Sequence, residues 1–219
     1  MRTLVLKTIA TLLGCYSLTA QTPQFPGPER TVRGTTIIST HDPAIQIQLP
    51  STAQYVGAVR WPLYNLADCE LHAFVDVDAQ RNVRNLYWIQ FEGYLPSKPD
   101  AHHTYDSPGH LQLGGLDFYV DTWPRANGEP SNAGSDREHV ETLIRDHGFQ
   151  LPAGMAYLRL VHLLDEQKRK ELMIIYGEAL PSGLPVADLK EGGKAHDQWP
   201  AIEDTLIHHA KQKISISLR

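Results

Sequence analysis

The sequence predicts an α+β fold, in which an antiparallel β-sheet carries two helices packed on one face. Most of the chain alternates apolar and polar residues with a period of two, which indicates strands. Two segments show the spacing of an amphipathic helix. Because these helices do not alternate with strands along the chain, the pattern disfavours a doubly wound parallel sheet.

Residues 1–20 predict a secretory signal peptide. Arg2 and Lys7 give a positive start, an apolar stretch follows, and Ala20 ends the segment with a small residue. The apolar stretch is too short and too interrupted to span a membrane. Cys15 stands where a bacterial lipoprotein carries its lipid, so cleavage after Ala20 and lipidation at Cys15 stay open as two routes. Both routes predict an exported protein, periplasmic or secreted, with membrane contact only through lipid on Cys15.

The mature chain is expected to begin with an extended segment. Residues 21–34 are rich in proline and predict a tether, and residues 35–219 are expected to form a single α+β domain. Alternation predicts the first strand at 45–49 and a second at 55–64. A proline within the second strand indicates an edge or a bend.

The middle of the chain contains the clearest strands. Segments 69–77 and 83–92 alternate on either side of a polar turn and predict a long hairpin. A short strand is expected at 116–120. Two nearly continuous apolar runs, at 155–164 and 171–178, predict strands in the centre of the sheet.

Two helices complete the prediction. Ser135 and Glu138 form a capping box, in which each side chain satisfies a free backbone donor, and Gly148 is a natural stop. Pro200 suits the first turn of the second helix, where its missing N–H costs nothing. Residues 214–218 alternate and predict a terminal strand.

Composition excludes several classes of function. The chain is 42% hydrophobic and has a formal net charge of −5, which argues against a nucleic-acid-binding partner. Cys15 belongs to the leader, so the exported chain has no internal disulfide. Cys69 lies on the apolar side of its strand, as a buried and inert thiol would. The chain lacks G-x-S-x-G, P-loop, H-E-x-x-H and C-x-x-C motifs, and no cofactor is expected.

A loop predicted over 96–115 contains the candidate metal ligands. Imidazole and carboxylate groups bind Zn²⁺, Cu²⁺ or Ni²⁺, and a loop can fold them inward. The candidates are His102, His103, Asp106 and His110. Their spacing matches no established metal signature, and the competing interpretation is an exposed polar loop.

Polar residues inside apolar strands supply the candidate catalytic groups. The residues of this kind are His72, Gln90, Glu92, Arg159, His162 and Glu171. Asp117, Tyr119 and Asp121 add a polar row on one face of a strand. A cleft lined by the sheet would use Glu92, Asp117, Tyr119, Arg159 and His162 as its acids, bases and cations. The competing interpretations are ion pairs between neighbouring strands and an ordinary solvated sheet face.

Three hypotheses of function follow. The first is a non-catalytic exported domain that binds a small molecule or a protein of the cell envelope, because no catalytic motif is assembled. The second is an exported enzyme, a hydrolase or an isomerase, with a polar cleft lined by the sheet. The third is a metal-handling protein that uses the loop from His102 to His110.

Overall fold

The computed structural model describes residues 25–219. The predicted signal peptide, both processing sites and the first part of the tether lie outside these residues. The strands of the described chain are β1 (Thr31–Arg33), β2 (Thr36–Thr40), β3 (Ala44–Gln48), β4 (Gln54–Leu63), β5 (Ala67–Val77), β6 (Val83–Tyr94), β7 (Gly109–Leu113), β8 (Leu116–Ala126), β9 (Gly154–Leu163), β10 (Lys170–Ala179) and β11 (Ser215–Leu218). The helices are α1 (Asp136–Asp146), α2 (Val186–Leu189), the 3₁₀ turn η1 (His196–Gln198) and α3 (Trp199–Lys213).

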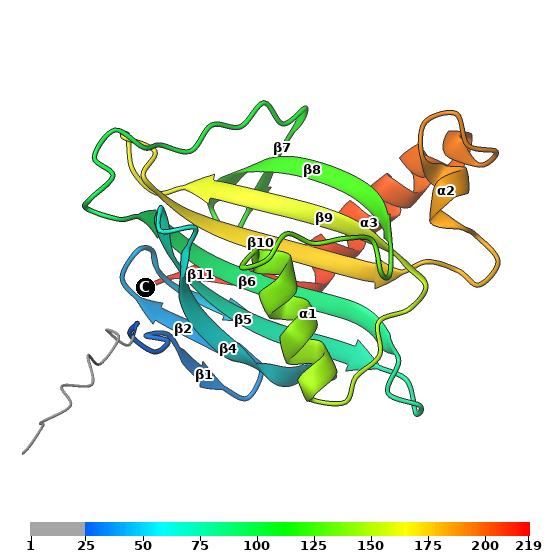
Figure 1. The fold of residues 1–219 in the computed structure, drawn as a ribbon, viewed down its shortest axis with the longest axis horizontal. Coiled ribbons are helices and arrows are strands. Elements are labelled where there is room, and N and C mark those ends of the chain that lie inside the picture. Colours follow the sequence, from blue (N-terminus) through cyan, green and yellow to red (C-terminus); the bar gives the residue numbers. More distant parts are fainter. Residues whose placement is uncertain (1–24) are drawn as a thin grey trace, which may run out of the picture.

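The strands form two antiparallel sheets (Figure 1). The large sheet has the order β4-β5-β6-β10-β9-β8-β7, and the small sheet has the order β1-β2-β3-β11. The predicted hairpin is confirmed as β5 and β6, and the two apolar runs form β9 and β10 inside the large sheet. The mainly antiparallel architecture with few helices therefore agrees with the predicted fold class.

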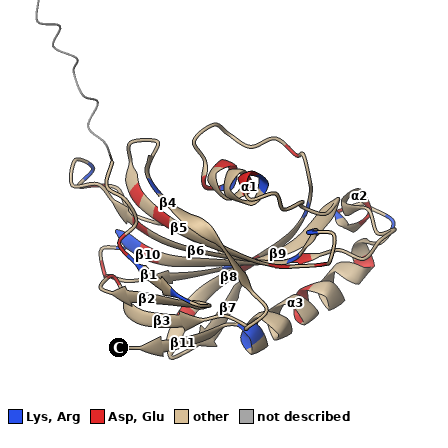
Figure 2. Cartoon of the chain, turned by 90° about the horizontal axis from the view of Figure 1, so that it is seen from below, with Lys and Arg blue, Asp and Glu red and all other residues tan. Residues whose placement is uncertain are grey.

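The two helices do not share one face of the sheet, so that part of the prediction is wrong. Val140 and Ile144 of α1 pack with one set of strand side chains, and Leu206 and Ala210 of α3 pack with the other set. The two sets alternate along the strands, as Ala73 and Phe74 do on β5, and therefore face opposite sides of the large sheet. Figure 2 shows α1 on one side and α3, together with the small sheet, on the other.

Several elements differ in extent from the sequence expectation. Thr31–Arg33 lies in the predicted tether but forms β1, because β2 offers it an antiparallel edge. Gly109–Leu113 lies in the predicted loop but forms β7 against β8. The strand expected at 116–120 continues to Ala126, since β9 pairs with it over that length.

The first long helix begins as predicted, with one change in its cap. Ser135 Oγ accepts a hydrogen bond from the Glu138 backbone N–H at 3.3 Å. The Glu138 carboxylate accepts from the N–H of Gly134 at 2.6 Å instead of returning to Ser135. The first contact satisfies a donor of the first turn, and the second satisfies the N–H of the residue before the cap. Between residues 25 and 219, every helix is too short or too polar to cross a membrane.

Candidate functional site

Two acidic side chains lie next to each other on neighbouring central strands. Glu92 of β6 pairs in register with Glu171 of β10, and on its other side with Cys69 of β5. Cys69 belongs to the core cluster that contains Val140 of α1, so this row faces the α1 side of the large sheet. Like charges directly opposite each other destabilise a sheet, so this pair requires a physical reason.

The loop between β6 and β7 brings a histidine to this acidic pair. The Arg169 guanidinium donates hydrogen bonds to five backbone carbonyls between Tyr94 and Ala101. The backbone N–H of His103 donates to the carbonyl of Lys168 at 2.8 Å. These contacts hold the loop against the turn before β10, and they place the His103 ring beside Glu171.

Glu92, His103 and Glu171 form a compact group of three, here called the Glu–His–Glu group. One ligand atom from each residue lies within 4.8 Å of the other two. His103 Nδ1 is 3.0 Å from Glu171 Oε2, and the Tyr105 hydroxyl donates to the same oxygen at 2.6 Å. His103 is 6% exposed and Glu171 is 2% exposed. His103 Nε2 is buried and has no hydrogen-bond partner within the described part of the chain.

The surroundings disfavour charge on every member of the group. Burial, together with the charge of the nearby Glu92, raises the pKa of Glu171 to about 8. Burial raises the pKa of Glu92 to about 7, with a second contribution from the charge of Asp136. Burial lowers the pKa of His103 to about 4. At neutral pH the imidazole is therefore neutral, so its 3.0 Å contact with Glu171 is not an ion pair.

Such a group can perform two kinds of chemistry. Two carboxyl groups with raised pKa values can hold and transfer a proton. Two carboxylates and a neutral imidazole can also bind a divalent transition-metal ion, whose positive charge would replace the protons. Both uses need the side chains close together in a buried site, as they are in this fold.

Arg159 and Asp121 lie beside the group on the same face of the sheet. Arg159 Nη2 is 2.6 Å from Asp121 Oδ2, and Ser107 of the loop donates to the same carboxylate oxygen at 2.7 Å. The Arg159 guanidinium stacks on Tyr105, with Cζ 5.2 Å from the ring centre. The positive charge of Arg159 is therefore paired with the Asp121 carboxylate, and its guanidinium lies against the Tyr105 ring.

Some of the predicted catalytic residues lie in or near the Glu–His–Glu group, and the others lie away from it. Glu92 belongs to the Glu–His–Glu group, and Arg159 lies beside it. The Tyr119 ring is 5.7 Å from Tyr105, at the outer side of the cluster. Asp117 is exposed and accepts a hydrogen bond from Gln112 instead. The His162 ring lies 5.7 Å from Phe118, which belongs to the core on the opposite face, so His162 cannot join the others.

The predicted metal ligands separate in the same way. His103 is buried in the group, whereas His102, Asp106 and His110 are exposed. The His110 ring packs against Tyr119, with 4.9 Å between the ring centres. The loop therefore contributes one of the four residues to a candidate ion site, because alternate residues of an extended loop face opposite ways.

Sequence reasoning missed two parts of the arrangement. Glu171 stands out as an acid at the start of an apolar strand, but its sequence position does not indicate that Glu92 is its neighbour. Tyr105 lies two residues after His103, and this spacing turns both rings toward Glu171. The alternation of exposure along the loop was the signal that could have selected His103 and Tyr105 together.

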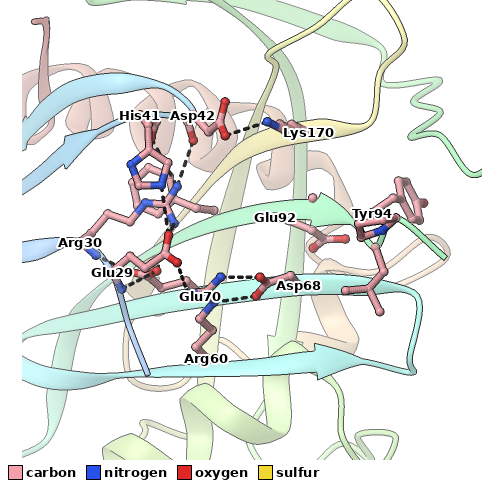
Figure 3. Close-up of a pocket in the computed structure, with 14 residues that line it drawn as sticks. Glu29, Arg30, His41, Asp42, Arg60, Asp68, Glu70, Glu92, Tyr94 and Lys170 are labelled. Carbon is pink, nitrogen blue, oxygen red and sulfur yellow. Dashed lines mark hydrogen bonds and ion pairs between the residues drawn. The ribbon is translucent and has the colours of Figure 1, made fainter. Parts of the chain in front are cut away.

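A second polar cluster lies on the opposite face of β5 and β6 and lines a pocket of about 280 Å³, which Glu92 of the Glu–His–Glu group also lines (Figure 3). Its charges are paired with one another: Arg60 contacts Glu29 and Asp68, and Arg30 contacts Glu70 at 3.0 Å. Glu70 also accepts the backbone N–H groups of Glu29 and Arg30. These contacts fasten the segment before β1 to the sheet, which is a structural role.

The charge state of Glu70 supports this role. Burial alone would raise the pKa of Glu70, but hydrogen bonds from His72 and from the backbone of Glu29 and Arg30 lower it to about 2. Glu70 is 1% exposed and stays ionised, in contrast to the two glutamates of the Glu–His–Glu group.

Comparisons with models of protein families, with curated proteins and with solved structures found no match to this chain. The function proposed below therefore rests on the geometry and chemistry of the site alone.

Proposed function

We propose that this chain is an exported metal-binding protein that holds one divalent transition-metal ion between Glu92, His103 and Glu171. The observation that carries the proposal is the approach of one carboxylate oxygen, one imidazole nitrogen and a second carboxylate oxygen to within 4.8 Å. Export through the predicted leader is part of the same proposal. It adopts the metal-handling hypothesis, because the buried group gives that hypothesis a specific site.

The size of the group suits a small ion. Zn²⁺ bonds to oxygen and nitrogen are about 2.0–2.2 Å long, so tetrahedral ligands lie roughly 3.4 Å apart. The ligand atoms of the Glu–His–Glu group lie within 4.8 Å of one another, so they would approach by up to about 1.4 Å on binding such an ion. Three protein ligands leave at least one coordination position for water or a further ligand.

The electrostatics of the group also favour an ion. Without a cation, the buried Glu171 and the half-buried Glu92 avoid repulsion by keeping protons, as the raised pKa values of both indicate. A divalent ion neutralises both carboxylates at once. The low pKa of His103 keeps the imidazole unprotonated, which is the form that binds metal.

A titration with metal tests the proposal. The full chain is purified without a histidine tag, freed of metal with a chelator, and titrated with Zn²⁺ and with Mn²⁺ in a calorimeter. We expect one ion per chain. His103→Gln and Glu171→Gln should abolish this binding, whereas His102→Gln is the matched control, because His102 is the exposed neighbour of His103. Absence of binding to the parent chain, or equal loss in both histidine variants, would overturn the proposal.

A further inference from the structure

Gln90 is a fully buried polar residue on the same strand as Glu92. We propose that Gln90 is a positioning residue that orients the Glu92 carboxylate for ion binding, and that Trp88 fixes the orientation of the Gln90 amide. The inference rests on the proposed function and deepens it. It concerns three residues of β6 whose side chains form a hydrogen-bonded chain that ends at the Glu–His–Glu group.

The geometry of this chain is continuous. The Trp88 indole N–H donates to Gln90 Oε1 at 3.0 Å, and Gln90 Nε2 donates to Glu92 Oε2 at 3.0 Å. The three residues are spaced by two along the strand, so their side chains share the face that α1 covers. Gln90 is 0% exposed and Trp88 is 4% exposed, so water does not compete for the bond between them, whereas the bond from Gln90 to the half-buried Glu92 is partly buried.

The donors and acceptors determine which way the amide faces. An indole offers only a donor, so it selects the carbonyl end of the Gln90 amide. The NH₂ end then necessarily faces Glu92. An ionised carboxylate only accepts hydrogen bonds, so this orientation favours the ion-binding form of Glu92. Without the indole donor, the amide is free to rotate and to turn its oxygen toward the carboxylate, which is repulsive.

The hydrogen bond also limits the motion of Glu92. A donor on Oε2 sets the plane of the carboxylate, and hence the direction in which the other oxygen faces. The second glutamate has an equivalent restraint, because Tyr105 donates to Glu171 Oε2. Groups that orient metal ligands in this way typically change ion affinity by about 10- to 100-fold when they are removed.

The test is a double-mutant cycle on ion affinity. Gln90→Leu, Trp88→Phe and the double variant are titrated with Zn²⁺ as full chains, and urea unfolding is measured separately for each. We expect Gln90→Leu to weaken affinity by about 10- to 100-fold. Trp88→Phe should weaken it by a smaller factor, and the double variant should be no weaker than Gln90→Leu alone.

Matched controls separate positioning from packing. Gln112→Leu removes a glutamine that donates to an exposed carboxylate, and Trp123→Phe changes another tryptophan on the same sheet face. Neither should alter ion affinity. If Gln90→Leu prevents folding, the test depends on Trp88→Phe alone. If Trp88 had only a packing role, this variant would lower the stability and leave the ion affinity unchanged.

Two outcomes would overturn the inference while leaving the ion site intact. One is a parent-like affinity in Gln90→Leu or, if that variant does not fold, in Trp88→Phe. The other is a loss of ion affinity on Trp88→Phe that is just as large in the Gln90→Leu variant as in the parent. Failure of the proposed function is distinguishable, because the parent chain would then bind no ion.

Discussion

The variant Glu171→Gln tests whether the pair of acids, Glu92 and Glu171, serves to bind a metal ion. Glu171 is 2% exposed, and burial together with Glu92 raises its pKa from the ordinary 4.5 to about 8. The folded protein therefore keeps a proton on Glu171 over a pH range in which the unfolded chain has lost it. Because the unfolded chain then binds fewer protons, the free energy of unfolding decreases as the pH rises from about 4.5 to about 8.

The magnitude follows from the size of the shift. One pKa unit corresponds to about 1.4 kcal/mol, so a rise from 4.5 to about 8 makes ionising Glu171 in the folded, ion-free protein cost on the order of 5 kcal/mol. Glutamine has nearly the same shape and carries no proton to lose. Below pH 5 the variant should be about as stable as the parent, and near pH 9 it should be more stable by up to roughly 5 kcal/mol.

The assay is urea unfolding, followed by tryptophan fluorescence, at pH values from 5 to 9 in the presence of a chelator. A parallel series near pH 7.5 includes Zn²⁺, which should stabilise the parent by about 2.7 kcal/mol at 100 times its dissociation constant. The ion should not stabilise Glu171→Gln. Glu166→Gln, in the exposed turn before β10, is the control and should follow the parent in both series.

Two results would refute the reasoning. Parallel pH profiles for the parent and Glu171→Gln would show that the carboxyl group is not held protonated by its surroundings. Equal stabilisation of both proteins by Zn²⁺ would show that Glu171 is not a ligand.

Three further predictions concern the framework. Glu70→Gln should lower the free energy of unfolding by about 3 kcal/mol at pH 7, because it leaves the Arg30 guanidinium without the Glu70 carboxylate. The difference in stability between variant and parent should vanish as the pH falls from about 4.5 through 2, where Glu70 itself becomes protonated. Arg169→Ala should increase amide hydrogen exchange in the loop that carries His103, and unchanged exchange would contradict the assigned role. Ser135→Ala should cost about 1 kcal/mol in thermal or urea unfolding, as expected for a lost helix cap; a change below a few tenths would show that the cap contributes little.

The individual strands could be predicted because their signal is local. The alternation around residues 69–77 and 83–92 identified β5 and β6, and the capping residue Ser135 identified the start of α1. Short strands such as β1 and β7 were missed, because their pairing partners, and not their own sequences, make them strands.

The site itself was only partly visible in the sequence. Glu92 was a candidate, and His103 was one of four residues in a polar loop. Their meeting with Glu171 depends on the order β6-β10 in the large sheet and on the path that Arg169 imposes on the loop. Neither feature has a local signal, because each joins residues that are far apart in the chain.

The sequence by itself determined the class of the fold, the length of the central strands and the presence of polar groups inside apolar segments. These properties follow from side-chain periodicity, which acts over a few residues. Only the tertiary structure decided which face each helix covers, which histidine of the loop turns inward and which carboxylates become neighbours. Those choices depend on strand order and long-range packing, and they turned two separate acids and one loop histidine into a single compact group.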